Sequence, residues 1–233
     1  MPELPEVETV VRGLQRAVVG DAIESVWIGE RKQPLKSPAR QIASALEGAR
    51  ITNVRRMGKH IVIDLQDSGQ AATTSGNVAP RGRRKPAKVA RPGRAKPTAA
   101  HFIVHLGMTG RMLVAAAGAP VAKHTHFIAR LASGREMRFV DPRMFGKLAV
   151  EHEAFDPGGS EPLEVGFEPF AALFRKRKTP IKSALLNQRL LRGVGNIYAD
   201  ESLFRAGVRP RRRAATLTRA ELWRLFESVR QVL

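Results

Sequence analysis

The sequence has no cysteine, which excludes disulfide bonds and thiolate metal sites from these 233 residues. It also lacks any apolar run that approaches the roughly 18 residues of a membrane-spanning helix. The N-terminus, MPELPEVETVV, carries acidic residues where a secretory signal peptide carries basic ones. These absences predict a cytoplasmic protein.

Acidic residues are scarce relative to basic ones. The chain has 21 Asp and Glu against 40 Lys and Arg, which gives a net charge of +19 and an isoelectric point near 11.5. This excess predicts a polyanionic partner, because each phosphate neutralised by a basic side chain releases condensed counterions. Nucleic acid is the leading partner, with a nucleoid-associated location. An anionic membrane surface is the alternative, but the basic residues do not line one face of a long amphipathic helix.

Hydrophobic periodicity predicts an α+β fold whose first half is mainly β. An N-terminal helix is indicated by apolar residues at helical spacing from Val7 to Val18, and Gly20 ends it. Short β-branched and apolar segments follow, which predicts a two-sheet antiparallel β-sandwich or a barrel packed beside one helix. The expected strands are Ile23–Ile28, Ile51–Arg56, Ile61–Leu65, Phe102–Leu106, Arg111–Ala115, Phe127–Leu131, Glu136–Val140 and Lys147–Val150.

The second half of the chain has a helical pattern. Helices are expected at Phe170–Arg175, Ile181–Gln188, Asn196–Ala206 and Thr218–Leu233. The domain boundary therefore falls near residues 152–165, with an N-terminal domain at 1–152 and a helical domain at 153–233. The last helix has no capping residue after it, which suggests a truncated chain.

Residues 68–100 do not fit the strand pattern. Between Arg81 and Lys96 there are eight Lys or Arg and no acidic residue. A segment of this composition buries too little surface to offset its ordering cost, so we expect a disordered basic insertion. A tether that touches phosphates and a solvated loop are both compatible with it.

The N-terminus and one turn carry the candidate catalytic residues. A small residue at position 2 normally allows the initiator Met to be removed, which would expose Pro2 as a secondary amine, partly neutral at physiological pH. Glu3 lies beside it, where a carboxyl group can move protons. Lys59, in the turn Gly58-Lys59-His60, is either a solvated turn residue or a phosphate contact that assists proton transfer.

Two glycine-containing turns suggest insertion into a base stack. HLGMTGR, residues 105–111, places Met108 between glycines, and DPRMFG, residues 141–146, presents Arg143 and Phe145. The alternative for Met108 and for Phe145 is simple burial in the core.

Two further segments suggest phosphate contacts. His124, in Lys123-His-Thr-His126, is expected to contact a phosphate rather than a metal, because neither cysteine nor a nearby acid is present. In the helical half, Gly193 and Gly195 tighten a helix–turn–helix in which Asn196 is expected at the helix N-cap. Such an element can grip a DNA backbone without reading bases.

Together these motifs resemble those of the bacterial formamidopyrimidine-DNA glycosylases and the related endonuclease VIII enzymes. The similarity lies in MPELPEVET, the Arg-Met-Gly-Lys turn, HLGMTGR, DPRMFG and GVGNIYADE, in that order along nearly the whole chain. It implies a β-sandwich and a helix–two-turn–helix domain with double-stranded DNA bound between them by a monomer. A general RNA-binding role would explain the charge but not the ordered motifs.

The resemblance implies a bifunctional glycosylase and AP lyase of base excision repair. Pro2 would attack C1′ of the damaged nucleotide and form a Schiff base, with Glu3 as proton donor or acceptor. Lys59 would contact phosphate and assist β-elimination, and β,δ-elimination would leave a one-nucleotide gap. Leu4 favours oxidised purines such as 8-oxoguanine and formamidopyrimidines, whereas endonuclease VIII relatives that prefer oxidised pyrimidines more often have Gly there.

The resemblance also implies which residues contact DNA. Met108, Arg143 and Phe145 would fill the gap left by the flipped nucleotide. The residues expected at the DNA backbone are His124, Arg143, Arg177, Lys182 and Asn196. Glu6 and Glu201 would lie at the lesion pocket.

The chain departs from the family pattern in its 68–100 insertion and beyond its last helix. Family members continue into a lesion-covering loop and a four-cysteine zinc finger. Without these we expect no metal site and no zinc in this chain, and weaker DNA binding. Two alternatives therefore stay open: an endonuclease VIII-like enzyme for oxidised pyrimidines, and a DNA-binding fragment with impaired catalysis.

Overall fold

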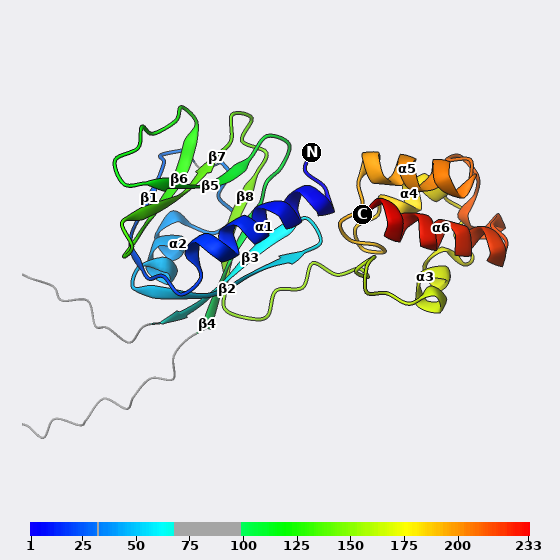
Figure 1. Ribbon diagram of the computed structural model, residues 1–233, viewed down its shortest axis with the longest axis horizontal. Helices are drawn as coiled ribbons and strands as arrows, with labels where there is room; N and C mark the ends of the chain where they lie inside the picture. Colours follow the sequence, from blue (N-terminus) through cyan, green and yellow to red (C-terminus); the bar gives the residue numbers. More distant parts are fainter. Residues whose placement is uncertain (32, 68–98) are drawn as a thin grey trace, which may run out of the picture.

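The computed structural model describes residues 1–31, 33–67 and 99–233, and within them it has an α+β architecture (Figure 1). The predicted basic insertion lies outside the described residues, except that Ala99 and Ala100 belong to a strand rather than to the insertion. No helix in the described ranges is long and apolar enough to cross a membrane.

Two four-stranded antiparallel sheets form the first half of the chain. One has the order β1-β6-β7-β5 and the other β2-β3-β4-β8, so each of the predicted strands is confirmed, several with longer ends. The strands are β1 Ile23–Ile28, β2 Ala49–Met57, β3 His60–Asp67, β4 Ala99–His105, β5 Arg111–Ala116, β6 Thr125–Leu131, β7 Arg135–Val140 and β8 Lys147–Glu151.

Helix α1, Leu4–Val18, buries one face against these sheets. Leu4, Val7, Val11, Leu14 and Val18 are buried, which is the helical spacing expected of an amphipathic helix. The N-terminal end of α1 faces the helical half of the molecule, so the first residues of the chain lie between the two halves (Figure 1).

The expectation of a single helix beside the sheets was wrong, because a second helix, α2, spans Ala39–Leu46. It begins directly after Pro38 and buries only Ile42 and Leu46. Two apolar positions are too few to establish a helical period, and contact with β1, β4 and β8 supplies the stability that the local pattern does not reveal.

The second half is helical and has its own core. Its elements are α3 Phe167–Phe174, α4 Ile181–Leu185, α5 Asn196–Ala206, the 3₁₀ turn η1 Ala214–Thr216 and α6 Arg219–Val232. The predicted helix at 181–188 is therefore shorter, since α4 ends at Leu185. A capping box between Thr218 and Glu221 begins α6. Residues 1–152 and 153–233 remain our proposed domain limits.

Candidate active site

The N-terminus of the chain is anchored to the helical half through Glu3. Its side chain is only 3% exposed. Oε1 accepts a hydrogen bond from the backbone N–H of Ile197 at 3.0 Å, and Oε2 accepts one from Tyr198 at 3.3 Å. These amides belong to the first turn of α5, where the helix dipole favours a carboxylate. Glu3 therefore joins the beginning of α1 to the beginning of α5.

Two glycines allow this close approach. A Cβ atom on Gly195 would lie 2.2 Å from the carboxyl carbon of Glu3, and one on Gly193 would lie 2.8 Å from Leu4 Cδ1. The backbone N–H of Leu4 donates to the Gly193 carbonyl at 3.1 Å. The glycines of GVGN thus provide space for the N-terminus of the chain, a role that the local sequence does not reveal.

Glu6 supports the same junction from the next position along α1. Its Oε2 accepts the backbone N–H of Glu3 at 2.9 Å, and its Oε1 accepts the Tyr198 hydroxyl at 2.9 Å. Burial acts to raise the pKa of Glu6, but these hydrogen bonds outweigh it and lower the pKa overall. The observed contacts of Glu6 are therefore with the N-terminal segment and α5.

Lys59 is buried, so the interpretation of it as a solvated turn residue is wrong. It is 6% exposed, between β2 and β3, in a turn where Gly58 has a φ of 58°. Burial lowers the pKa of the Lys59 ammonium, and the nearby carboxylates of Glu3 and Glu6 oppose this effect. A buried lysine that titrates below its usual range can exchange protons more readily than a surface lysine.

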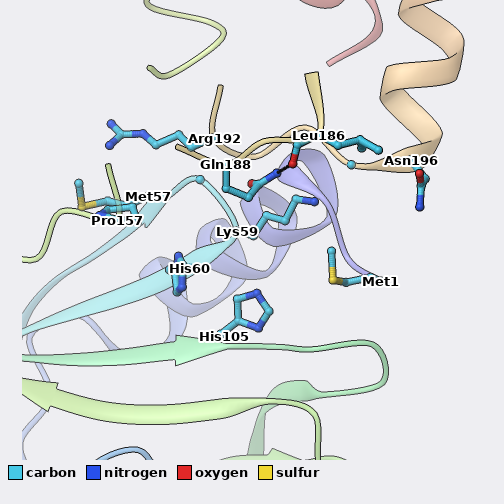
Figure 2. A pocket seen from close by; sticks show the side chains of 12 residues that line it. Met1, Met57, Lys59, His60, His105, Pro157, Leu186, Gln188, Arg192 and Asn196 are labelled. Atoms are coloured by element: carbon cyan, nitrogen blue, oxygen red, sulfur yellow. Dashed lines mark hydrogen bonds between the residues drawn. The ribbon is translucent and has the colours of Figure 1, made fainter. Parts of the chain in front are cut away.

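A pocket of about 360 Å³ brings these segments together. Figure 2 shows Met1, Lys59 and Asn196 around it, with His60 and His105 on the sheet side. Met1 lines the pocket and Glu3 is fixed to α5, so Pro2 joins a pocket residue to the α5 anchor along the chain. The lining residues are Met1, Met57, Gly58, Lys59, His60, His105, Pro157, Leu186, Gln188, Arg192, Gly195 and Asn196.

An ion-pair network crosses from the sheets to the helical half beside this pocket. Arg56, at the end of β2, donates to both carboxylate oxygens of Glu161 at 2.9 and 3.1 Å and to Glu8 at 2.9 Å. Arg192 donates to the same Glu161 at 3.2 Å. Arg56 also contacts the Gly58 carbonyl at 3.3 Å, so the network supports the turn that carries Lys59. Glu8, near the N-terminal end of α1, belongs to this network.

His105 is a pocket residue that the sequence analysis did not select. Its Nδ1 accepts the backbone N–H of Gly107 at 3.1 Å, and its ring centroid lies 5.0 Å from that of His60. Burial, together with the nearby His60, Lys147 and Lys59, lowers the pKa of His105 to about 4. Its place in HLGMTGR, two residues before a glycine turn, was the signal that could have identified it.

This lowered pKa predicts a pH-dependent stability. Between pH 6.5 and about 4, the unfolded chain binds a proton at His105 that the folded chain does not. The free energy of unfolding should therefore fall as the pH falls through this window, by about 3 kcal/mol from this residue. Denaturant titrations at several pH values should show a shallower fall for His105→Asn, which keeps an acceptor for Gly107 but does not titrate. The exposed His152→Asn control should follow the native curve, and an equal fall in His105→Asn would contradict the assignment.

Met108 and Phe145 are both on the surface, so burial in the core is wrong for each. Met108 is 44% exposed and Phe145 is 51% exposed. The Arg143 guanidinium lies 4.8 Å from the centre of the Phe145 ring. The two turns touch through their backbones, because a Cβ on Gly107 would lie 2.5 Å from the carbonyl carbon of Phe145. The structure thus brings these three side chains to neighbouring turns.

The residues proposed at the DNA backbone are spread over the surface. His124 is exposed with a φ of 67°, and His126 is buried with Nε2 at 3.0 Å from the Asp141 carbonyl. Asn196 is exposed, but it is the first residue of α5 and Gly195 is the N-cap, which corrects the expected cap. Within the described residues, no group of three or more His, Asp or Glu is arranged to hold a metal ion.

The remaining candidates lie on the helical half. Arg177 is exposed and donates to the Leu173 carbonyl at 2.6 Å. Lys182 forms an ion pair of 2.8 Å with Asp200. Glu201 is exposed on α5. Only Asn196 among the helical candidates lines the pocket that contains Lys59.

Comparison with known proteins matches both halves of the chain. Residues 1–148 match the formamidopyrimidine-DNA glycosylase N-terminal domain, and residues 159–233 match the formamidopyrimidine-DNA glycosylase H2TH domain. The chain is 37% identical to the formamidopyrimidine-DNA glycosylase of Nocardia farcinica over 247 residues, covering 100% of this chain and 76% of the relative. It is also 37% identical to that of Xanthomonas campestris over 241 residues, covering 100% and 77%.

Solved structures show the same similarity. The Lactococcus lactis Fpg bound to DNA containing an abasic site matches with a TM-score of 0.78 and 26% identity, covering 99% of this chain and 76% of that chain. MutM (Fpg) from Thermus thermophilus matches with a TM-score of 0.75 and 32% identity, covering 99% and 74%. The fold and the matched domains define a DNA glycosylase of base excision repair. This chain belongs to the formamidopyrimidine-DNA glycosylase family, whose enzymes also have AP lyase activity.

Proposed function

We propose that this chain removes oxidised purines, 8-oxoguanine and formamidopyrimidines, through a Schiff base at Pro2 and cleaves the strand by β,δ-elimination. The main support is that Met1 and the buried Lys59 line one pocket, while Glu3, two residues after Met1, is held by the first turn of α5, whose residue Asn196 also lines that pocket. The substrate is double-stranded DNA, consistent with the net charge of +19.

The chemistry requires that Met1 be removed. The lone pair of the Pro2 nitrogen then attacks C1′ as the bond from C1′ to the damaged base breaks, and the base leaves with a proton. Opening of the sugar ring transfers a proton to O4′ and leaves an iminium ion at C1′. This electron sink allows loss of a C2′ proton and cleavage of the C3′–O bond, and then loss of a C4′ proton and cleavage of the C5′–O bond.

Glu3 and Lys59 have separate proposed roles in these steps. Glu3 lies beside Pro2 and serves the ring oxygen as proton donor or acceptor. Lys59 binds the phosphate beside the lesion and assists proton transfer during β-elimination. The zinc finger implied by the family resemblance requires cysteines, which this chain lacks, so no step is assigned to a metal.

DNA binding is supported by two basic segments of the helical half. Residues 175–182 and 209–215 lie side by side, because Ile181 N–H donates to the Arg212 carbonyl at 2.8 Å and Ala214 N–H donates to the Thr179 carbonyl at 3.0 Å. Their exposed basic residues are Arg175, Lys176, Arg177, Lys178, Arg209, Arg211 and Arg213. We propose that this surface binds the phosphate backbone together with Lys182, Asn196, His124 and Arg143, and that Glu6 and Glu201 lie at the lesion pocket.

The choice of oxidised purines has two supports. The first is Leu4, and the second is a relative, because a mutant of the Lactococcus lactis enzyme has been solved with DNA containing Fapy-dG. The structural match to that complex has a TM-score of 0.79 and 26% identity, covering 99% of this chain and 76% of that chain. Oxidised pyrimidines are the alternative class of substrate.

Borohydride trapping on three duplexes tests this proposal. The duplexes contain 8-oxoguanine opposite cytosine, an oxidised pyrimidine, or an abasic site. We expect the covalent complex with 8-oxoguanine and with the abasic site. Preferential trapping on the oxidised pyrimidine would favour the alternative enzyme. Trapping on the abasic site alone would show amine chemistry without lesion capture, and no trapping on any duplex would leave a DNA-binding fragment.

A further inference from the structure

A buried carboxylate joins the two turns that carry the proposed gap-filling side chains. We call these turns, residues 107–110 and 142–146, the wedge turns. Asp141 immediately precedes the second of them and is 0% exposed. Its side chain forms none of the ion pairs found among the described residues. A buried carboxylate is costly unless donors surround it, so the position of those donors indicates what Asp141 does.

The donors come from both wedge turns. Oδ1 accepts the Thr109 hydroxyl at 2.5 Å and the backbone N–H of Arg143 at 3.2 Å. Oδ2 accepts the backbone N–H of Gly146 at 2.7 Å. One carboxylate therefore holds the first turn beside Met108 and the second turn on both sides of Phe145.

The backbone of Asp141 also contacts a third segment, residues 124–126. The Asp141 N–H donates to the His124 carbonyl at 3.0 Å, and the Asp141 carbonyl lies 3.0 Å from His126 Nε2. Close packing leaves little room for the turns to shift, since a Cβ on Gly146 would lie 2.4 Å from Phe139 Cζ. Asp141 thus lies where all three segments meet.

We propose that Asp141 is a positioning residue that makes the wedge turns one rigid unit, so that Met108, Arg143 and Phe145 enter the DNA gap together. The inference rests on the proposed gap-filling function of these side chains. Rigidity matters because three side chains on independent turns would each lose conformational freedom on insertion, whereas turns already fixed to each other lose less. Asp141 itself does not have to touch DNA.

The test measures how much more tightly the protein binds an abasic-site duplex than an intact duplex, and it does not depend on catalytic activity. Dissociation constants are compared for a duplex with a tetrahydrofuran abasic analogue and for an intact duplex. Thr109→Val removes the hydroxyl that donates to Asp141 while keeping a similar shape. We expect it to reduce the preference for the abasic duplex about tenfold, the scale of one hydrogen bond to a charged group. Affinity for the intact duplex should not change.

Three variants separate positioning from general stability. Thr109→Ser keeps the donor and should restore the preference. Thr52→Val removes an exposed threonine hydroxyl that donates to the Asp64 carbonyl at 3.0 Å, away from the wedge turns, and should match the native protein. In a Phe145→Ala background, Thr109→Val should have a much smaller further effect, because the two changes act through the same insertion.

Each other outcome is decisive. A native preference in Thr109→Val would overturn the positioning role, and so would equal weakening on both duplexes without rescue by serine. If the native protein itself shows no preference for the abasic duplex, the proposal that these side chains fill the gap left by the flipped nucleotide is wrong, and so is the positioning role of Asp141. That result is recognised from the native protein alone, and borohydride trapping tests the Pro2 chemistry separately.

Discussion

Protein that retains Met1 is expected to form almost no borohydride-trapped complex with an abasic-site duplex. Retention turns the Pro2 nitrogen into a tertiary amide, which has no basic lone pair and cannot form an iminium ion. The Met1 side chain also lines the pocket, so it occupies space that the sugar would need. We expect trapping to fall by about 10³-fold or more, the scale on which loss of a nucleophile lowers a rate.

The comparison needs two preparations that differ only at Met1. One is made in a host whose methionine aminopeptidase is inhibited, and intact mass distinguishes it from the processed form. Both should bind an intact duplex equally, because Met1 is 53% exposed and supports none of the ion pairs that join the two halves. Equal trapping by both preparations would show that Pro2 is not the nucleophile. Lys59, the other amine at the pocket, would then be the candidate.

Lys59→Met is expected to lower the rate of β-elimination by about 10²-fold or more, the range of general acid–base assistance. The free energy of unfolding should stay the same or rise near neutral pH, because burial disfavours the ammonium group and lowers its pKa. A loss of activity without a loss of stability would separate a functional lysine from a structural one. Single-turnover cleavage of an abasic duplex and denaturant unfolding measure the two quantities.

The pH dependence of the same variant supplies a further check. Between the lowered pKa of Lys59 and its usual 10.5, the unfolded chain binds a proton that the folded chain does not. The stability of the native protein should therefore rise with pH in that window relative to Lys59→Met. The exposed Lys36→Met is the control for loss of one positive charge. If Lys59→Met unfolds more readily and cleaves at the native rate, the proposed role is wrong.

Strong local patterns predicted the sheets and most of the helices. Strands such as Ile61–Leu65 and Phe127–Leu131 combine β-branched or aromatic residues with glycine-containing turns, and α1 has a regular helical period. The family motifs were equally informative about the candidate site, because they keep their order along the chain. Helix α2 was missed because its stability comes from contact with three strands rather than from its own residues.

The sequence by itself determined the fold class, the basic charge, the family motifs and the exclusion of cysteine-based chemistry. Tertiary structure alone decided that Lys59 is buried, that Glu3 is held by the first turn of α5 and that Asp141 joins the wedge turns. The physical reason is distance along the chain. Burial and carboxylate hydrogen bonds arise here between residues as far apart as Glu3 and Ile197, and no local pattern records which donors will surround a given acid.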